Sequence, residues 1–298
     1  MKILKWIGIA LVSLIIIVAA IFLFQIRNAE NLIQRTVEIK PVQMTIPDDS
    51  VSLAIGEIWV RALCADCHNS DLGGKMFVDD PDLIGTIYTP NITKGQGGIA
   101  YYTDENWLSS LRHGVSPTGK PLMIMPSQEF TKMRAEDIGG IIAYMKTVPP
   151  VDRTNGQTEF KPFAKFLVSI GAFGDLFSYD VIDHQAPIPE NITDETPYDR
   201  GKYLSLVTGC QSCHGEALSG QVTPDPNSPP SANLTPGGNL ANWSYDDFTS
   251  FMHSGKTKEG KIIDTKFMPW QAYSHLPEEE LEAIFTYLKS QDALETTQ

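Results

Sequence analysis

CADCH at residues 64–68 recurs as CQSCH at residues 210–214, and these two runs use all four cysteines of the 298-residue chain. Cys-x-x-Cys-His is the motif at which haem c is attached covalently. Two thiols three positions apart can each add to one vinyl group of the same porphyrin, and the adjoining histidine then ligates the iron. A dithiol redox motif or a zinc site could also use Cys-x-x-Cys, but neither requires that histidine. We therefore predict two covalently bound haem c groups, held by Cys64, Cys67 and His68 and by Cys210, Cys213 and His214.

Length and charge limit the classes of partner. The chain is long enough for two domains of ordinary size, and 42% of its residues are apolar. Its formal charge is −13, which argues against nucleic acid and favours a docking partner with a basic face. A simpler interpretation, that the charge mainly confers solubility, stays open.

The N-terminus predicts a membrane anchor. Lys2 and Lys5 precede an uncharged, mainly apolar run from Trp6 to Phe24, which as a helix spans about 28 Å, close to the hydrocarbon thickness of a bilayer. Lysines before the run place the N-terminus in the cytoplasm. Because the apolar run continues past Ala19 and Ala20, we expect an uncleaved anchor rather than a signal peptide. The predicted location is the bacterial cytoplasmic membrane, spanned once, with the haem domains on the periplasmic side.

An internal repeat becomes visible when the two motifs are used as anchors. Each half carries the same markers in the same order, at separations that drift slowly from the 146 positions between Cys64 and Cys210. The paired markers are Asn91-Ile92-Thr93 with Asn233-Leu234-Thr235, Gly114 with Gly255, Met125-Pro126 with Met268-Pro269, and Tyr144 with Tyr287.

Each repeat predicts the same series of helices. One helix leads into the motif, over about 55–65 and 198–211; a short helix starts at Thr103 or Ser244, where a hydroxyl can cap it. Gly114 and Gly255 are expected to end that short helix. A closing helix carries apolar residues at three- and four-residue spacing. These residues are Ile138, Ile141, Ile142 and Met145 in the first repeat and Leu281, Ile284, Phe285 and Leu288 in the second.

No strand pattern is needed, so the predicted fold is all-α, with two tandem haem domains behind one transmembrane helix. The segment between the domains is too long for an unstructured loop, and it contains an apolar stripe at helical spacing that starts at Pro162. We expect this stripe to pack against the haem domains or bridge them. The alternatives are that it contacts the membrane surface or binds a partner. The stripe consists of Phe166, Leu167, Ile170, Phe173 and Phe177.

The chain is thus predicted to divide into five segments. These are an anchor (1–25), a connection (26–50), the first domain (51–150), the linker (151–197) and the second domain (198–298).

The sixth iron ligand decides the chemistry, because an empty position permits peroxide or gas chemistry and a filled one restricts the iron mainly to moving electrons. Met125 and Met268 each precede a proline and lie 19 residues before the tyrosine of the closing helix. That shared position predicts Met125, rather than Met123, as the ligand, with Met268 as its counterpart. Surface or propionate-side positions are expected for His113, His184, His253 and His275.

Residues 55–146 and 199–289 resemble the class I cytochrome c fold. The run of haem motif, Asn-Ile-Thr or Asn-Leu-Thr loop, acidic short helix and Met-Pro loop is similar to the cytochrome c subunits of membrane-bound bacterial dehydrogenases. The resemblance implies axial pairs His68/Met125 and His214/Met268, and it implies that the Asn91 and Asn233 loops border the haem. Those subunits often carry three haem motifs, whereas this chain has two.

These observations predict an electron-transfer protein rather than an enzyme: a membrane-anchored diheme cytochrome c that carries single electrons between a membrane or periplasmic oxidoreductase and a respiratory acceptor. The expected partners are subunits of a membrane-bound dehydrogenase or terminal oxidase, or other cytochromes, together with the lipid bilayer around residues 6–24. A diheme peroxidase, a diheme subunit of a terminal oxidase and a haem-based sensor remain alternatives.

Overall fold

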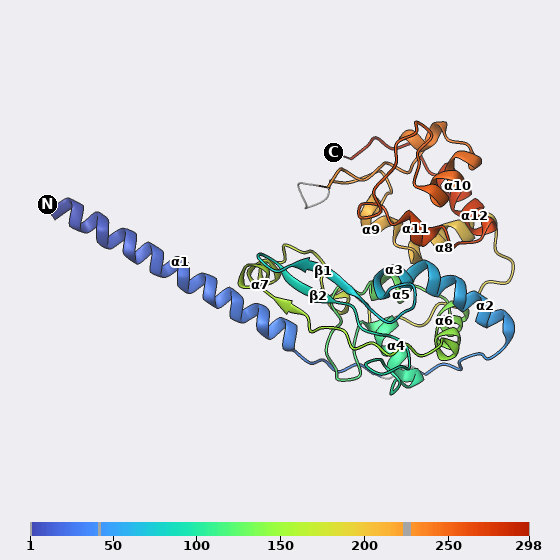
Figure 1. Ribbon diagram of the computed structural model, residues 1–298. Coiled ribbons are helices and arrows are strands. Elements are labelled where there is room, and N and C mark those ends of the chain that lie inside the picture. Colours follow the sequence, from blue (N-terminus) through green and yellow to red (C-terminus); the bar gives the residue numbers. More distant parts are fainter. Residues whose placement is uncertain (1, 41–42, 223–227, 298) are drawn as a thin grey trace.

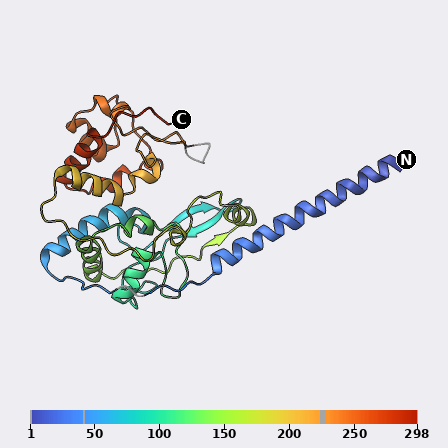
Figure 2. The same ribbon diagram turned by 180° about the vertical axis from the view of Figure 1, so that it is seen from behind.

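The computed structural model describes residues 2–40, 43–222 and 228–297, and it is mostly helical, as predicted. One long helix, α1, projects away from two helical units (Figure 1), and the view from behind shows the same separation (Figure 2). The helices are α1 (Lys2–Gln34), α2 (Ser50–Trp59), η1 (Val60–Cys64), α3 (Ala65–His68), α4 (Asp104–His113), α5 (Ser127–Phe130), α6 (Ala135–Thr147), α7 (Pro162–Ser169), η2 (Ser178–Asp180), α8 (Pro197–Val207), α9 (Cys210–His214), η3 (Asn239–Asn242), α10 (Tyr245–Ser254), α11 (Trp270–Tyr273) and α12 (Glu278–Lys289).

Within the described residues, α1 is the one helix long and apolar enough to cross a membrane. It does not end near residue 25 as predicted but continues to Gln34. No proline or glycine interrupts this stretch, and the first unit covers one face of it, burying Ala29 completely. The segment predicted as a connection therefore begins as helix.

The helix before each motif differs from the prediction in detail. α2 begins at Ser50 rather than near residue 55, because the Asp49 side chain accepts hydrogen bonds from the backbone N–H groups of residues 51 and 52 and caps the helix. It then continues through the π-helical turn η1 into α3. In the second unit, Gly209 has a left-handed backbone (φ 75°) and separates α8 from α9, so the predicted single helix is two helices.

The remaining repeat elements agree with the prediction. α4 and α10 begin at capping boxes formed by Thr103 and Ser244, and they end at Gly114 (φ 62°) and Gly255 (φ 66°). α6 and α12 bury the predicted apolar positions except Phe285, which is partly buried, and Ile138 and Leu281 are fully buried. Both units are thus built on the same local rules.

The first and last helices of each unit cross where the chain has a glycine. A Cβ added to Gly56 would lie 1.9 Å from the carbonyl oxygen of Gly140, and one added to Gly201 would lie 1.8 Å from that of Ala283. Only a residue without a side chain permits such an approach. The pairs α2–α6 and α8–α12 therefore pack backbone to backbone.

The first unit also contains a small sheet, so the strand-free prediction is wrong. β1 (Met76–Asp80) pairs antiparallel with β2 (Gly85–Tyr88), and β2 pairs antiparallel with β3 (Glu159–Phe160). Gly85 lets the strands meet, because a Cβ there would lie 1.9 Å from the carbonyl oxygen of Glu159. β3 comes from the linker, so the pattern near β2 gives no sign of its partner.

The predicted linker helix exists as α7, with Pro162 at its first turn. It packs against α1, with the Phe166 ring 5.5 Å from that of Phe22, and not as a bridge between the units. α7 ends at Ser169, so the last members of the predicted stripe lie beyond it. One of them, Phe177, is buried and forms a β-bridge with Met123.

Candidate functional site

The two Cys-x-x-Cys-His runs occupy matching places in the two units, at the end of the first helical segment. α3 ends at His68 and α9 at His214. All four cysteines are free of disulfides. Burial raises the pKa of the Cys64 thiol to about 12 and also raises the pKa of Cys210. These two sulfurs are therefore protonated at neutral pH.

Each motif histidine is oriented by one hydrogen bond. Nδ1 of His68 lies 3.0 Å from the carbonyl oxygen of Pro90, and Nδ1 of His214 lies 2.7 Å from that of Ala232. A carbonyl only accepts, so Nδ1 carries the proton and Nε2 keeps its lone pair. Burial lowers the pKa of both imidazoles. Both rings are thus neutral and leave Nε2 free to bind a metal, and the bond at Nδ1 is of the kind that orients metal-binding histidines.

The two carbonyls that hold the histidines belong to residues directly before Asn91 and Asn233. Oδ1 of Asn91 accepts from the N–H and hydroxyl of Thr93, and its Nδ2 donates to the Val151 carbonyl at 2.7 Å. Asn233 makes the same bonds, to Thr235 and, at 2.8 Å, to the Leu294 carbonyl. The asparagines therefore fix the loop that fixes the histidine.

The loops after the two motifs share a backbone hydrogen bond and an unusual backbone conformation. The N–H of Gly74 donates to the carbonyl of His68 at 2.8 Å, and that of Gly220 donates to His214 at 2.9 Å. Leu72 and its counterpart Leu218 both have left-handed backbones, at φ 59° and 58°. Positive φ is uncommon for leucine, so its occurrence at the same place in both loops marks one shared backbone design.

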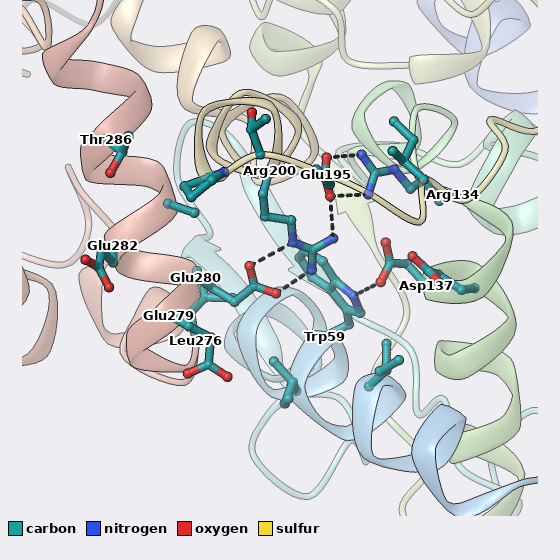
Figure 3. Close-up of a pocket in the computed structure, with 17 residues that line it drawn as sticks. Trp59, Arg134, Asp137, Glu195, Arg200, Leu276, Glu279, Glu280, Glu282 and Thr286 are labelled. Carbon is teal, nitrogen blue, oxygen red and sulfur yellow. Dashed lines mark hydrogen bonds and ion pairs between the residues drawn. The ribbon is translucent and has the colours of Figure 1, made fainter.

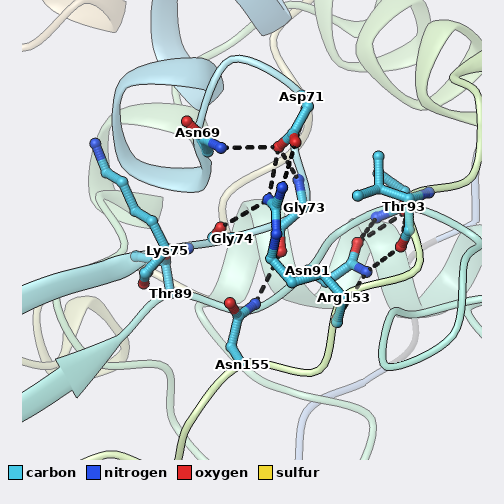
Figure 4. Close-up of polar contacts among 11 residues, drawn as sticks. Asn69, Asp71, Gly73, Gly74, Lys75, Thr89, Asn91, Thr93, Arg153 and Asn155 are labelled. Carbon is cyan, nitrogen blue, oxygen red and sulfur yellow. Dashed lines mark hydrogen bonds and ion pairs between the residues drawn. The ribbon is translucent and has the colours of Figure 1, made fainter.

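One ion pair is specific to the first unit. Arg153 donates from both terminal nitrogens to the carboxylate of Asp71, and Figure 4 shows this pair above the Asn91 loop. The hydrogen bonds from Arg153 lower the pKa of Asp71 to about 2. The pair joins the loop after the first motif to the chain that leaves α6.

The Met-Pro loops adopt the same backbone conformation. Pro126 has φ −80° and ψ 53°, and Pro269 has φ −78° and ψ 53°. The carbonyls of Met125 and Met268 each accept the N–H two residues on, at 2.8 Å. Both methionine side chains are partly buried against the core. In the first unit the buried Ser178 hydroxyl also donates to the Met125 carbonyl at 2.5 Å, so the linker supports this loop.

The donor set of each unit fits a haem c. It offers two free thiols, one neutral imidazole with an available Nε2, and a thioether on a braced loop. The buried Nε1 of Trp243, in the second unit, has no hydrogen-bond partner among the described residues. Such an orphaned donor suits a bound group that carries acceptor oxygens.

The other histidines are placed differently from one another. His253 and His275 are exposed, as predicted. His113 is not a surface residue: it is 2% exposed and its Nδ1 lies 2.9 Å from Nδ1 of His184. Burial lowers the pKa of His113 to about 4. Its position at the end of α4 turns it toward the linker, which the sequence alone does not reveal.

The contact between the units contains buried polar residues that sequence reasoning missed. Asp137 is buried and accepts hydrogen bonds from Nε1 of Trp59, at 2.6 Å, and from the hydroxyl of Tyr203 in the second unit. Burial raises the pKa of Asp137. Asp137 lies in the first turn of α6, where an acidic residue is ordinary, so the sequence held no distinct signal for this contact.

An ion-pair chain surrounds this contact. Arg134 pairs with Glu195, and Arg200 pairs with Glu280, along a cavity of about 730 Å³ between the units (Figure 3). Nearby, the Ser212 hydroxyl inside the second motif donates to Glu129 of α5, at 2.6 Å. α11, which follows Met268, contacts η1, which ends at Cys64. Each unit's Met-Pro segment therefore packs against the haem-motif region of the other unit.

Comparison with known families matches the second unit. Residues 198–292, which span α8 to α12, match the cytochrome c family. The second unit is therefore a cytochrome c domain, a fold that holds haem c covalently, and the predicted resemblance is confirmed.

The relatives include cytochrome subunits of dehydrogenases. The chain is 30% identical, over 85% of its length, to the gluconate 2-dehydrogenase cytochrome c subunit of Pantoea cypripedii, covering 63% of that protein. It is 28% identical over 78% of its length to the fructose dehydrogenase cytochrome subunit of Gluconobacter japonicus, covering 50% of it. The chain is also 27% identical to a diheme cytochrome c-type protein of Cereibacter sphaeroides. That match includes 78% of this chain and 83% of that protein. The chain thus spans half to under two thirds of the dehydrogenase subunits named here.

Proposed function

We propose that this chain is a membrane-anchored diheme cytochrome c that carries single electrons from a membrane-bound dehydrogenase toward a respiratory acceptor. The two units, 51–150 and 198–298, are its haem domains. The first haem is held by Cys64 and Cys67 with His68 and Met125 as axial ligands. The second is held by Cys210 and Cys213 with His214 and Met268.

One observation carries this proposal: the polar contacts that present the histidine are duplicated in full. In both units a carbonyl directly before an asparagine holds Nδ1, and that asparagine is locked by the same three hydrogen bonds. Selection for core packing alone gives no reason to repeat a buried polar arrangement at this level of detail. A requirement, in both units, for a histidine Nε2 that is free to bind a metal does give such a reason.

When bound, haem c supplies reversible one-electron storage at its iron. The protein supplies the ligand set and its surroundings. Neutral imidazole and thioether ligands favour the reduced state and raise the reduction potential. The carbonyl bond to Nδ1 increases the basicity of each imidazole. The Met-Pro loops would present the thioethers to the iron as further ligands, which suits a carrier rather than a catalyst.

The contact between the units supports an internal relay. Glu129 reaches Ser212 inside the second motif, and α11 lies against the helical turn that ends at Cys64. The buried Trp59–Asp137–Tyr203 contact joins the units beside this region. A buried, hydrogen-bonded contact of this kind would hold the two attachment segments close together.

The relatives and α1 support the membrane assignment. Dehydrogenase cytochrome subunits are among the similar proteins, and α1 has the length and composition of a transmembrane helix. We place both domains on the periplasmic side, where haem c is attached. The chain's charge of −13 favours a basic docking face on the partner.

Replacing the proposed thioether ligands tests this function. Met125→Ala and Met268→Ala should each convert one haem to a high-spin, lower-potential form that binds carbon monoxide. Met123→Ala is the matched control, since it removes a methionine two positions away in the same loop and should leave both haems low-spin. If the Met125→Ala spectrum and potential equal those of the parent, the ligand assignment is wrong. Peroxide turnover by the parent protein would instead favour a diheme peroxidase.

A further inference from the structure

α7 lies against α1 at the level where the apolar run ends. The Phe166 ring is 5.5 Å from that of Phe22, and Lys165 pairs with Glu30 at 2.8 Å. Phe22 is inside the apolar run and only two residues before its end at Phe24, a step of about 3 Å along a helix axis. α7 therefore sits at the boundary between the apolar and polar parts of α1, next to the units (Figure 1).

The exposure of α1 places the bilayer surface at the same level. Residues 2–21 of α1 are exposed on every side, and none of its most apolar window is covered by protein. From Phe22 onward one face of the helix is covered, at Phe22, Ile26, Ala29 and Ile33. These positions follow the spacing of a single helix face. The bare part of α1 is thus the part that lipid has to cover.

Apolar side chains stay exposed beside this boundary. α7 buries Ala164 and Val168, while Phe163 is 41% exposed and Ile170, just past its end, 51%. Phe173, in the turn that follows, is 40% exposed. Single exposed apolar residues are ordinary, but these three belong to one eleven-residue stretch that is fixed against the proposed anchor.

The β1–β2 turn extends this surface. The N–H of Lys161 donates to the carbonyl of Ile84 at 3.0 Å, which brings the turn to the start of α7. Leu83 in that turn is 50% exposed. We call the surface formed by Leu83, Phe163, Ile170 and Phe173 the α7 face.

The charges around the α7 face do not favour anionic lipid. Lys165 is paired with Glu30, and Lys161 lies 3.4 Å from Glu159. Asp82 and Asp175 are exposed next to the apolar residues. Contact with a membrane here therefore depends on insertion of apolar side chains, which zwitterionic lipid permits.

The first unit cannot turn freely about α1. Arg35 pairs with Asp180 at 2.6 Å and lies 4.9 Å from the Phe177 ring centre, and the N–H of Val37 donates to the Gly119 carbonyl at 2.8 Å. These contacts join the end of α1 to the linker and to the loop before Met125. The same face of the unit must then always point toward the membrane.

We propose that the α7 face lies in the headgroup region of the bilayer that α1 spans, and so fixes the orientation of the first haem domain on the membrane. This inference rests on the proposed membrane anchor. Its consequence is that the docking surfaces for electron partners are those pointing sideways and away from the bilayer.

Single cysteines in the full-length holoprotein test the inference, because haem attachment leaves any added cysteine as the only free thiol. Phe163→Cys, Phe173→Cys and the control Ile262→Cys, which is 70% exposed in the second unit, would be placed in phosphatidylcholine nanodiscs. Each would be treated with a charged maleimide or an apolar maleimide and analysed by intact mass. The intact mass also reports whether α1 is present and how many haems are attached, so failure of the proposed function is recognised separately.

At positions 163 and 173 the charged reagent should react at least about tenfold more slowly than at position 262, equivalent to an exclusion of about 1.4 kcal/mol. The apolar reagent should react at all three. Equal reaction with the charged reagent would show that the α7 face is in water and would overturn the inference. Protection from both reagents would mean that protein covers this face, which would overturn it as well.

Discussion

Gly201→Ala tests the helix crossing on which the second unit is built. A Cβ at this position would lie 1.8 Å from the carbonyl oxygen of Ala283 and 2.8 Å from Cβ of Tyr287. Non-bonded carbon atoms prefer about 3.5–4.0 Å, so α8 and α12 have to separate by roughly 1.5 Å. The nearest obstacle is backbone, which cannot rotate away.

The expected cost follows from these distances. Overpacking costs about 1–3 kcal/mol, and a backbone obstacle places this substitution at the upper end. Alanine regains about 0.5–1 kcal/mol over glycine inside a helix. The net loss of about 2 kcal/mol corresponds to a roughly 30-fold increase in the population of the opened unit.

Hydrogen exchange with mass spectrometry measures this change in the full-length protein. Amides of α8 and α12 should exchange about 30-fold faster in the variant, while those of α2 and α6 serve as an internal reference. Gly8→Ala is the control, because no atom lies within 4 Å of its added Cβ. Unchanged exchange in α8 and α12 would refute the close crossing. Gly56→Ala should instead give faster exchange in α2 and α6.

Arg153→Ala should raise the pKa of Asp71 from about 2 toward the ordinary 3.8, which NMR of the carboxyl carbon would follow. In the parent protein the lowered pKa stabilises the fold at pH values above 3.8, and this stabilisation is lost as the pH falls toward about 2. Ser178→Ala removes the donor to the carbonyl of Met125, the proposed ligand of the first haem. It should increase the fraction of that haem without methionine, seen as loss of the methionine-to-iron charge-transfer band. Tyr203→Phe removes one of the hydrogen-bond donors to the buried Asp137. This should destabilise the contact between the units by about 1–3 kcal/mol, as measured by urea unfolding.

Each of these outcomes has a defined contradiction. An unchanged titration of Asp71 would mean that the ion pair does not form in solution. An intact charge-transfer band in Ser178→Ala would show that the linker does not position the methionine. Tyr198→Phe, at an exposed tyrosine, is the control for Tyr203→Phe, and equal stability of the two variants would remove the buried contact from the account.

Much of the molecule was predictable because its signals are local. The caps at Thr103 and Ser244 and the terminal Gly114 and Gly255 each depend on residues within one helical turn. The start of α2 was missed by five residues, although the Asp49 cap before it is equally local. The ligand candidates were found because the two halves of the chain repeat the same spacing.

The errors arise where distant parts of the chain meet. Thr86 pairs with Glu159 in the small sheet, and neither strand is apolar or long enough to indicate its partner. His113 is buried only because the linker folds back over the end of α4. The π-helical turn before Cys64 and the contact between the units likewise depend on tertiary packing, which overrides local preference.

The number of haems attached per chain tests the central claim most directly. Intact mass of the denatured, full-length protein should show two covalent haems, and one haem in each of the double variants Cys64→Ala/Cys67→Ala and Cys210→Ala/Cys213→Ala. A parent protein with a single haem, or a double variant with the same haem content as the parent, would contradict the account of two haem domains.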